Sequence, residues 1–510
     1  MSQHFTKFLH YQTLGEFLEF VSSNGGAYIN NAFGPSFGQD FEVIDPASGT
    51  EWVTLKGCSE ADVGRAVAAA STCFESYRRI PARARARLIL EWDRLIREYK
   101  SEIAHIITLE TGKPFKEALG EVDYALTFSW WMAGEAERTH GSVIDGAAIA
   151  SNRFLVVKKP IGVVGCLTAW NFPVALLVRK VATALAAGCT VVAKPSPETP
   201  VSALMIAMLA EHAGFPAGAF NVLPCDMKHT PEIGRAICEH RDVKKVSFTG
   251  STAVGRLLAS QCAPHLKKLT LELGGNGAFI IFDDANLPLA VNSLMQCKFR
   301  NSGQTCVSAQ RVYVQCSIYN KVVEMLQSRI ASDLVVGPGL NGNTNLGPLT
   351  TSRSVSKVES HIHDAVNRGA KIVVGGRVPD YTDPNGYFYE PTLLADVHED
   401  MLISKEETFG PVLALYRFES EGEVIRRANN TDMGLTSYFF TENANRIWRV
   451  FEALECGNVG INTGMTTSAE APFGGWHDSG YGKEAGLKYA IDEYLKVKSG
   501  TWQVDFDQNR

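Results

Sequence analysis

The sequence predicts an α/β fold of two lobes, followed by strand segments suited to pairing between subunits. From about residue 153, short β-rich runs alternate with helical patterns, and a second such series follows Glu272. This alternation is typical of parallel sheets covered by helices on both faces. The chain of 510 residues is also too long for one core, because a domain commonly holds about 100–200 residues.

A helical region at residues 59–138 opens the first lobe. Its start at Ser59, with Asp62 three residues later, resembles a capping box, in which two side chains satisfy free backbone groups. Ala-, Arg- and Glu-rich stretches continue the pattern. We therefore expect a group of helices before the first sheet.

Two series of strands follow this helical region. The first holds the runs FLVVKKPIGVVGCLTAW, CTVVAKP, AFNVLP, KVSFTG and KLTLELGG, and the second holds FIIF, RVYVQ, KIVVGG and VLALYRF. Two α/β lobes favour an active site in the cleft between them. Residues around 140–158 and those after about Lys483 also have strand character and are suited to pairing with another subunit.

Composition and charge exclude several classes of protein. The net charge of −6 opposes nucleic acid or an anionic membrane surface as the main partner. The most apolar region, 161–193, contains Arg179 and Lys180, so a membrane span is not expected. The eleven cysteines are scattered without metal-ligand spacing, and the first residues match neither a signal nor a transit peptide. We expect a cytoplasmic protein without a metal site.

Three polar residues are candidates for covalent chemistry. Cys306, in NSGQTC, has the small polar surroundings of a nucleophile, although a lone cysteine is more often a small buried hydrophobe. Glu272, at the end of the run LTLELGG, suits a general base, or alternatively a structural partner of a cation. Asn171, in TAWNFP, suits an oxyanion donor, although Asn-X-Pro also occurs in ordinary turns. The presence of all three motifs in one chain is difficult to explain by chance.

A nucleotide site is indicated by two further strand ends. Lys194 ends the run CTVVAKP, and residues 248–251 (FTGS) end another run and open the helix TAVGRLL. The N-terminus of a helix offers free N–H groups and a positive dipole end to a pyrophosphate. Gly250 and Gly255 are the glycines of this turn, so the common GxGxxG fingerprint is absent.

Seven segments, in the order WNFP, KPSPETP, FTGSTAVG, LELGGNG, GQTC, EETFGP and APFGG, resemble the aldehyde dehydrogenase superfamily. The resemblance covers the chain from about residue 40 to its end. It implies a Rossmann-like cofactor domain of residues 1–139 and 159–271, a catalytic domain of residues 272–482, and an oligomerisation arm of residues 140–158 and 483–510. A homodimer or homotetramer is expected on the same ground.

The resemblance also implies a role for each candidate. Cys306 is the nucleophile that forms a thioester, Asn171 and the Cys306 backbone N–H hold the oxyanion, and Glu272 activates water. The residues that match cofactor-binding positions in the family are Trp170, Lys194, Ser196, Pro197, Gly250, Ser251, Glu407 and Phe409.

One position departs from the pattern of NAD-preferring relatives. These usually have a glutamate three residues after the lysine, whereas this chain has Pro197 there and Glu198 one residue later. Without that carboxylate a 2′-phosphate meets less repulsion, and Lys194 can pair with it. We therefore expect NADP to be accepted as well as, or in preference to, NAD.

The motifs WNFPxxxxxRK and FRNxGQTC resemble succinate-semialdehyde dehydrogenases, in which two arginines receive the distal carboxylate of the substrate. The matching residues are Arg179 and Arg300, and the planar guanidinium suits a carboxylate because it donates two parallel hydrogen bonds. Thr467, with Ser468 beside it, matches the hydroxyl that completes this anion site. A short semialdehyde with an anionic tail is expected, with succinate semialdehyde as the best match.

Several alternatives remain open from the sequence. Two arginines recognise an anion in general, so a sulfolactaldehyde, glutarate-semialdehyde or 2-oxoglutarate-semialdehyde dehydrogenase fits as well. A CoA-acylating enzyme fits less well, because Glu272 supplies a base for hydrolysis. A non-catalytic protein on the same fold is opposed by the presence of Cys306, Glu272, Asn171 and Lys194 together.

Overall fold

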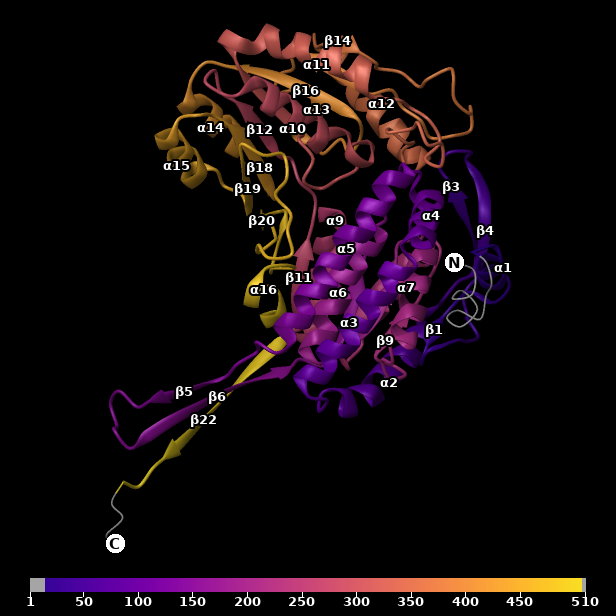
Figure 1. Ribbon diagram of the computed structural model, residues 1–510, viewed down its shortest axis with the longest axis vertical. Coiled ribbons are helices and arrows are strands. Elements are labelled where there is room, and N and C mark those ends of the chain that lie inside the picture. The colour runs from indigo at the N-terminus through magenta and orange to yellow at the C-terminus, as the bar shows by residue number, and fades with distance from the viewer. Residues whose placement is uncertain (1–13, 507–510) are drawn as a thin grey trace.

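The computed structural model describes residues 14–506 and has the expected α/β architecture (Figure 1). The first lobe is built on an eight-stranded sheet with the strand order β2-β1-β9-β8-β7-β10-β11-β21. The five neighbouring strands from β9 to β11 are parallel. The strands are β1 (Tyr28–Ile29), β2 (Ala32–Phe33), β7 (Val163–Leu167), β8 (Thr190–Lys194), β9 (Phe220–Val222), β10 (Val243–Thr249), β11 (Lys268–Glu272) and β21 (Gly480–Tyr481).

The predicted helical region of the first lobe is confirmed. The backbone N–H of Ser59 donates to Asp62 Oδ2 at 2.8 Å, as the capping pattern predicts. This region contains α2 (Glu60–Tyr77), α3 (Ala82–Glu98), α4 (Lys100–Thr111) and α5 (Phe115–Ala136). The lobe also contains α1 (Leu14–Asn24), α6 (Pro173–Ala187), α7 (Pro200–His212), α8 (Thr230–Glu239) and α9 (Thr252–Cys262).

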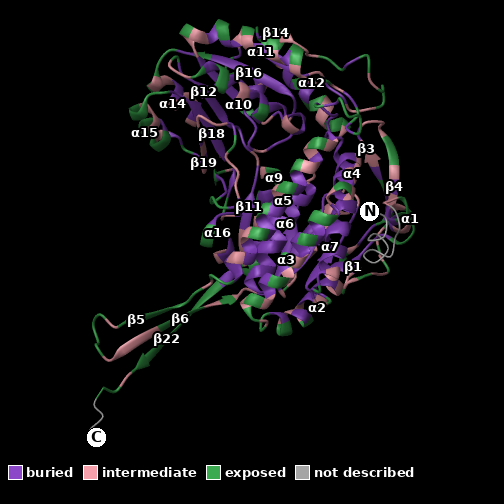
Figure 2. Ribbon diagram, in the orientation of Figure 1, coloured by how far each residue is buried: buried purple, intermediate pink, exposed green. Residues whose placement is uncertain are grey.

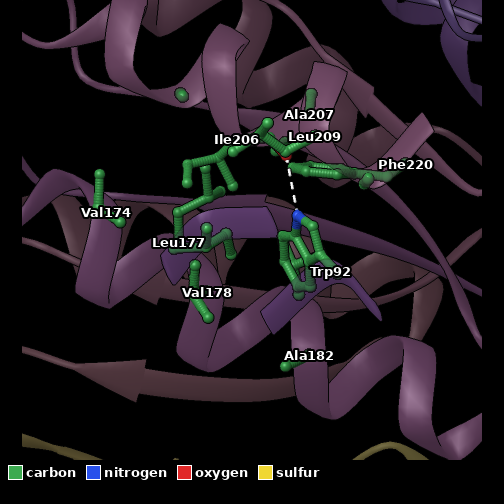
Figure 3. Close-up of a cluster of buried hydrophobic side chains, with 14 of the residues drawn as sticks. Trp92, Val174, Leu177, Val178, Ala182, Ile206, Ala207, Leu209 and Phe220 are labelled. Carbon is green, nitrogen blue, oxygen red and sulfur yellow. Dashed lines mark hydrogen bonds between the residues drawn. The ribbon is translucent and has the colours of Figure 1, made fainter. Parts of the chain in front are cut away.

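Helix α6 lies in the middle of this lobe, and every one of its residues is buried. Its apolar side chains Leu177 and Val178 lie near Trp92 of α3, whose indole N–H donates to the carbonyl of Ile206 at 3.0 Å (Figure 3). A helix that is buried on all sides must also bury its polar residues, and α6 carries Arg179 and Lys180. Both cations therefore need carboxylate partners within the protein.

The second lobe is built on a seven-stranded sheet with the order β14-β15-β16-β13-β12-β18-β19, which is parallel apart from β14. All four runs predicted for it form strands. The strands are β12 (Ala278–Ile281), β13 (Arg311–Gln315), β14 (Lys371–Val374), β15 (Thr392–Ala395), β16 (Val412–Phe418), β18 (Thr436–Phe440) and β19 (Asn458–Ile461).

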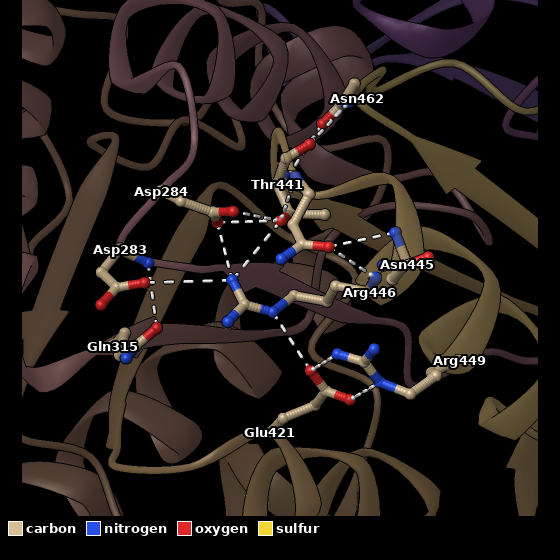
Figure 4. Close-up of polar contacts among 10 residues, drawn as sticks. Asp283, Asp284, Gln315, Glu421, Thr441, Asn445, Arg446, Arg449 and Asn462 are labelled. Carbon is tan, nitrogen blue, oxygen red and sulfur yellow. Dashed lines mark hydrogen bonds and ion pairs between the residues drawn. The ribbon is translucent and has the colours of Figure 1, made fainter.

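Helices and a polar cluster complete the second lobe. Arg446 of α15 contacts Asp284 at 2.8 Å and Glu421 of α14 at 3.1 Å, and so ties both helices to the end of β12 (Figure 4). The helices are α10 (Leu287–Phe299), α11 (Tyr319–Asp333), α12 (Ser352–Asn367), α13 (Leu402–Lys405), α14 (Glu421–Asn429) and α15 (Ala444–Ala453).

A three-stranded antiparallel sheet projects from the body and is largely exposed (Figures 1 and 2). It contains β5 (Ser142–Asp145), β6 (Asn152–Pro160) and β22 (Leu495–Gln503). The arm was expected to begin at residue 483, but helix α16 (Leu487–Asp492) comes first and lies against α5 and α6. Residues 487–492 thus pack against the first lobe before the chain enters β22.

Two small strand pairs complete the described structure. Strand β3 (Asp40–Asp45) pairs with β4 (Thr50–Lys56), and β17 (Met433–Gly434) pairs with β20 (Trp476–His477). Within residues 14–506, none of the helices is both long enough and apolar enough to cross a membrane.

Candidate active site

A cavity of about 300 Å³ is lined by residues from both lobes. Asn171 follows β7, Glu272 ends β11, and Cys306 follows the helical segment after α10, yet all three line this cavity. The structure thus brings together the three residues that the sequence singled out for covalent chemistry.

Cys306 is presented by a strained backbone. Asn301, Ser302 and Gly303 have φ values of 51°, 53° and 76°, a left-handed conformation that non-glycine residues rarely adopt. The thiol of Cys306 donates to Glu272 Oε1 at 3.7 Å. Burial, and then the charge of Glu272, raise the pKa of the Cys306 thiol well above its ordinary value. The thiol is therefore neutral until a base takes its proton.

Glu272 is the buried carboxylate nearest to that thiol. Its Oε2 contacts Arg179 Nη2 and accepts a hydrogen bond of 3.0 Å from the hydroxyl of Thr249. Burial raises the pKa of Glu272, and the guanidinium of Arg179 opposes that increase. The position suits a general base, because a raised pKa makes the carboxylate a better proton acceptor near neutral pH.

Asn171 is held at the start of the turn into α6. Its side-chain amide donates to the carbonyl of Gln304 at 3.0 Å, so it lies against the segment that carries Cys306. The Asn171 backbone carbonyl accepts from the Lys113 ammonium at 2.7 Å and from the Asn301 amide at 2.9 Å. Lys113 was not identified from the sequence.

The two cations of helix α6 share carboxylates from distant parts of the chain. Glu484 Oε2 lies 2.8 Å from Arg179 Nη2, and Glu484 Oε1 contacts Lys180 and accepts from Ser247 at 2.9 Å. Although burial raises the pKa of Glu484, Lys180 and Arg179 lower it to about 2. Glu484 was not identified from the sequence, although two cations within an apolar helix indicate that carboxylate partners must exist elsewhere.

The expected anion-site residues are placed differently from one another. Arg179, Arg300 and Thr467 line the cavity, and the Arg300 guanidinium lies 5.3 Å from the Phe172 ring. Ser468 is not among the lining residues, and its hydroxyl contacts Glu470 instead. The sequence match concerned Thr467, with Ser468 beside it, and of these two residues Thr467 lines the cavity.

Most expected cofactor residues line the same cavity. The rings of Trp170 and Phe409 meet edge to face at 5.5 Å, and Ser251 accepts from the third N–H group of α9 as its N-cap. Burial raises the pKa of Glu407 to about 7. The lining residues of this group are Trp170, Gly250, Ser251, Glu407 and Phe409.

The remaining expected cofactor residues lie at the carboxyl end of β8. Lys194 and Ser196 are buried, and Pro197 lines a second cavity together with Glu198 and Arg353. Glu198 accepts from the Ser196 hydroxyl at 2.5 Å and pairs with Arg353 at 3.3 Å. A cation, a helix N-terminus and a carboxylate suit the phosphates and ribose hydroxyls of a dinucleotide, so these residues fit such a cofactor.

The chain is similar to known proteins over most of its length. The model of the aldehyde dehydrogenase family matches residues 34–499. The chain is 45% identical over 461 residues to succinate-semialdehyde dehydrogenase [NADP(+)] of Escherichia coli, which covers 90% of this chain and 94% of that protein. It is 44% identical over 473 residues to glutarate-semialdehyde dehydrogenase of Pseudomonas putida, over 92% of this chain and 96% of that one.

A solved structure is similarly close. The succinate-semialdehyde dehydrogenase of Burkholderia pseudomallei superposes with a TM-score of 0.91 at 44% sequence identity. The superposition covers 94% of this chain and 98% of that chain. The likeness therefore extends over both lobes.

Proposed function

Because this chain belongs to the aldehyde dehydrogenase family, we propose that it is an oxidoreductase that converts a short aldehyde with an anionic tail to the acid. Succinate semialdehyde is the best candidate. One observation carries the proposal: Arg179 and Arg300 line the same cavity as Cys306. An arginine pair next to the nucleophile suits a substrate with a carboxylate near its aldehyde.

The first chemical step forms a bond between Cys306 and the aldehyde carbon. Glu272 accepts the thiol proton, and the thiolate attacks the carbonyl. The amide of Asn171 and the backbone N–H of Cys306 then donate to the oxygen that becomes negative. Both groups belong to buried segments, so they are oriented before the substrate arrives.

The second step hydrolyses the acyl group from Cys306. A bound dinucleotide supplies the hydride acceptor that converts the first adduct to a thioester. After Glu272 has passed the thiol proton to solvent, its carboxylate takes a proton from water, the water oxygen bonds to the thioester carbon, and the C–S bond breaks to leave the Cys306 thiolate. Release to water rather than to CoA is supported by the 3.7 Å contact between Cys306 and Glu272.

The cofactor is proposed to be NADP or NAD, with NADP accepted. Pro197 offers no carboxylate to repel a 2′-phosphate, and the charge of Glu198 is offset by Arg353. The relative from Escherichia coli is named for NADP(+). The residues that would hold the dinucleotide are Trp170, Lys194, Ser196, Gly250, Ser251, Glu407 and Phe409.

Glutarate semialdehyde is a second candidate, supported by the relative from Pseudomonas putida. A substrate panel with both cofactors tests the proposal, using succinate, glutarate and 2-oxoglutarate semialdehydes, sulfolactaldehyde and butyraldehyde. We expect acidic aldehydes to exceed butyraldehyde in kcat/KM. Arg300→Ala should reduce that advantage about ten- to hundredfold, because loss of a charge-assisted hydrogen bond costs about 1.5–3 kcal/mol. Equal values for butyraldehyde would refute the acidic substrate, and absence of any burst of reduced cofactor would refute catalysis.

We also propose that the projecting sheet joins copies of this chain. Strands β5 and β22 expose the apolar side chains of Val143, Ile144, Val497 and Trp502 at 51–69%. Apolar side chains on a projecting sheet are costly in water and favour an interface. Sedimentation should give two or four times the chain mass of 55.7 kDa, and a monomer would contradict the proposal.

A further inference from the structure

Arg179, which the proposed substrate site requires, already holds another carboxylate. Its Nη2 contacts Glu272 and lies 2.8 Å from Glu484. Its Nε is buried and has no hydrogen-bond partner among residues 14–506. A buried donor without a partner is costly, and this one belongs to a residue that lines the cavity. The free Nε therefore indicates a place for a ligand oxygen.

The atoms involved form one edge of the guanidinium. Arginine binds a carboxylate side-on through Nε and Nη2, as Arg449 does with Glu421 at 2.7 and 2.9 Å (Figure 4). In Arg179 the Nε of this edge has no partner among residues 14–506, whereas Nη2 is in contact with both Glu272 and Glu484. A carboxylate that binds Arg179 side-on must therefore compete for Nη2 with the carboxylates already in contact with it, of which Glu272 lies beside the Cys306 thiol.

We propose that the distal carboxylate of the substrate takes the Nε–Nη2 edge of Arg179 and displaces Glu272, so that an acidic aldehyde releases the general base as it binds. This inference rests on the proposed function. The exchange keeps one carboxylate on that edge throughout. Glu484 stays paired with Lys180 and continues to hold the guanidinium in place.

The released Glu272 moves away from Arg179 and becomes more basic. The 3.0 Å hydrogen bond from Thr249 and the 3.7 Å contact with Cys306 do not involve Arg179, so these two residues keep it beside the thiol. Burial and the charge of Glu484 raise the pKa of Glu272, whereas Arg179, and to a smaller extent Lys180, lower it, so loss of the Arg179 contact raises the pKa further. The carboxylate then takes a proton from water more readily, while the oxygen of that water adds to the thioester and the thiolate of Cys306 leaves.

Supplying the aldehyde and the carboxylate as two separate molecules tests whether the carboxylate releases the base. Acetaldehyde with acetate has the carbon atoms and the charge of succinate semialdehyde but lacks the central bond. With acetaldehyde alone, Glu272 stays in contact with Arg179, so hydrolysis should be slow. A burst of reduced cofactor should then precede a slow steady state. Added acetate should raise the steady-state rate about tenfold, within the range that a general base contributes. An acetate effect that is absent or inhibitory would overturn the exchange.

Variants of the two arginines test whether the effect passes through Glu272. Arg179→Gln should abolish stimulation by acetate and move the acid limb of the pH profile with acetaldehyde upward by about 1–3 pH units, because a nearby cation lowers a carboxyl pKa by that amount. Arg300→Gln is the matched control. It removes a guanidinium that lines the same cavity but lies against Phe172 and not against Glu272. Its acid limb should stay in place. An equal shift of the acid limb in the two variants would overturn the proposal.

A third variant covers the case in which Arg179→Gln fails to fold. Arg179→Lys keeps the charge but lacks the two-donor edge, so the acid limb should stay while the acetate effect is lost. Retained stimulation in this variant would contradict side-on exchange. Failure of the proposed function has a different signature: acidic aldehydes would then have no advantage in kcat/KM over neutral ones.

Discussion

The ammonium of Lys113 donates a hydrogen bond of 2.7 Å to the backbone carbonyl of Asn171. The same ammonium pairs with Glu121 at 2.5 Å, and the other oxygen of Glu121 accepts from the N–H of Val174 at 2.9 Å. Lys113 and Glu121 are buried. This pair therefore holds the turn between β7 and α6 that presents the Asn171 amide to the cavity.

Replacement of Lys113 should affect catalysis through the position of Asn171. Lys113→Met is expected to lower kcat about ten- to hundredfold, because the loss of one oxyanion donor costs about 10²–10³ and displacement loses part of that. The double variant Lys113→Met/Glu121→Gln removes the unpaired buried charge and should regain thermal stability but not kcat. Recovery of both properties together would mean that the pair acts on stability alone.

Replacement of Glu272 should move turnover and thiol reactivity in opposite directions. Glu272→Gln is expected to lower kcat by about 10²–10⁴, the usual contribution of a general base. The charge of Glu272 raises the pKa of the Cys306 thiol, so its removal lowers that pKa and increases the thiolate fraction at neutral pH. Alkylation of Cys306 by iodoacetamide, followed by mass spectrometry, should therefore become faster. Slower alkylation would argue against this charge effect.

Arg353 should influence the choice between NADP and NAD. It pairs with Glu198 at 3.3 Å, so Arg353→Ala leaves that carboxylate without its cation beside the proposed ribose site. We expect kcat/KM for NADP to fall about tenfold or more, since a charged hydrogen-bonding group contributes about 1.5–3 kcal/mol, while the value for NAD changes little. Arg377→Ala, which removes an exposed arginine paired with Glu390 at 3.2 Å, is the matched control. An equal fall for both cofactors would contradict this role.

Glu484 should stabilise the fold in a pH-dependent way. Its pKa lies near 2 in the folded protein against an ordinary value of 4.5, so its contribution is complete above 4.5 and is lost as the pH falls toward 2. Glu484→Gln should lower the free energy of unfolding by about 3–5 kcal/mol at neutral pH, since it leaves Arg179 and Lys180 underpaired. Denaturant titration at neutral and acidic pH checks this.

The control for that measurement is an exposed ion pair. Arg78 and Glu75 lie 2.6 Å apart on the surface of the first lobe, so Glu75→Gln should cost at most about 1 kcal/mol at either pH. The loss for Glu484→Gln should become smaller at acidic pH. A loss that is the same at both pH values would show that packing, and not charge, accounts for it.

The sequence by itself determined the fold class and the places of the main chemical groups along the chain. The alternating runs became strands, the region 59–138 became helices, and Glu272 ends a strand as its motif predicts. These features depend on periodicity and turn chemistry within about ten residues, which a sequence displays directly. The ordered motifs likewise indicated the family that the comparisons support.

Only the tertiary structure decided which charges meet. Glu484 lies 305 positions after Arg179 (484 − 179), and no local pattern indicates that Glu484 and Glu272 both meet Arg179 on one buried helix. Ser468 and the start of the projecting arm also depended on packing. The physical reason is that a cation inside an apolar helix must be neutralised, but the choice of carboxylate depends on how distant segments fold against it. That choice placed the proposed general base and the proposed substrate arginine in contact.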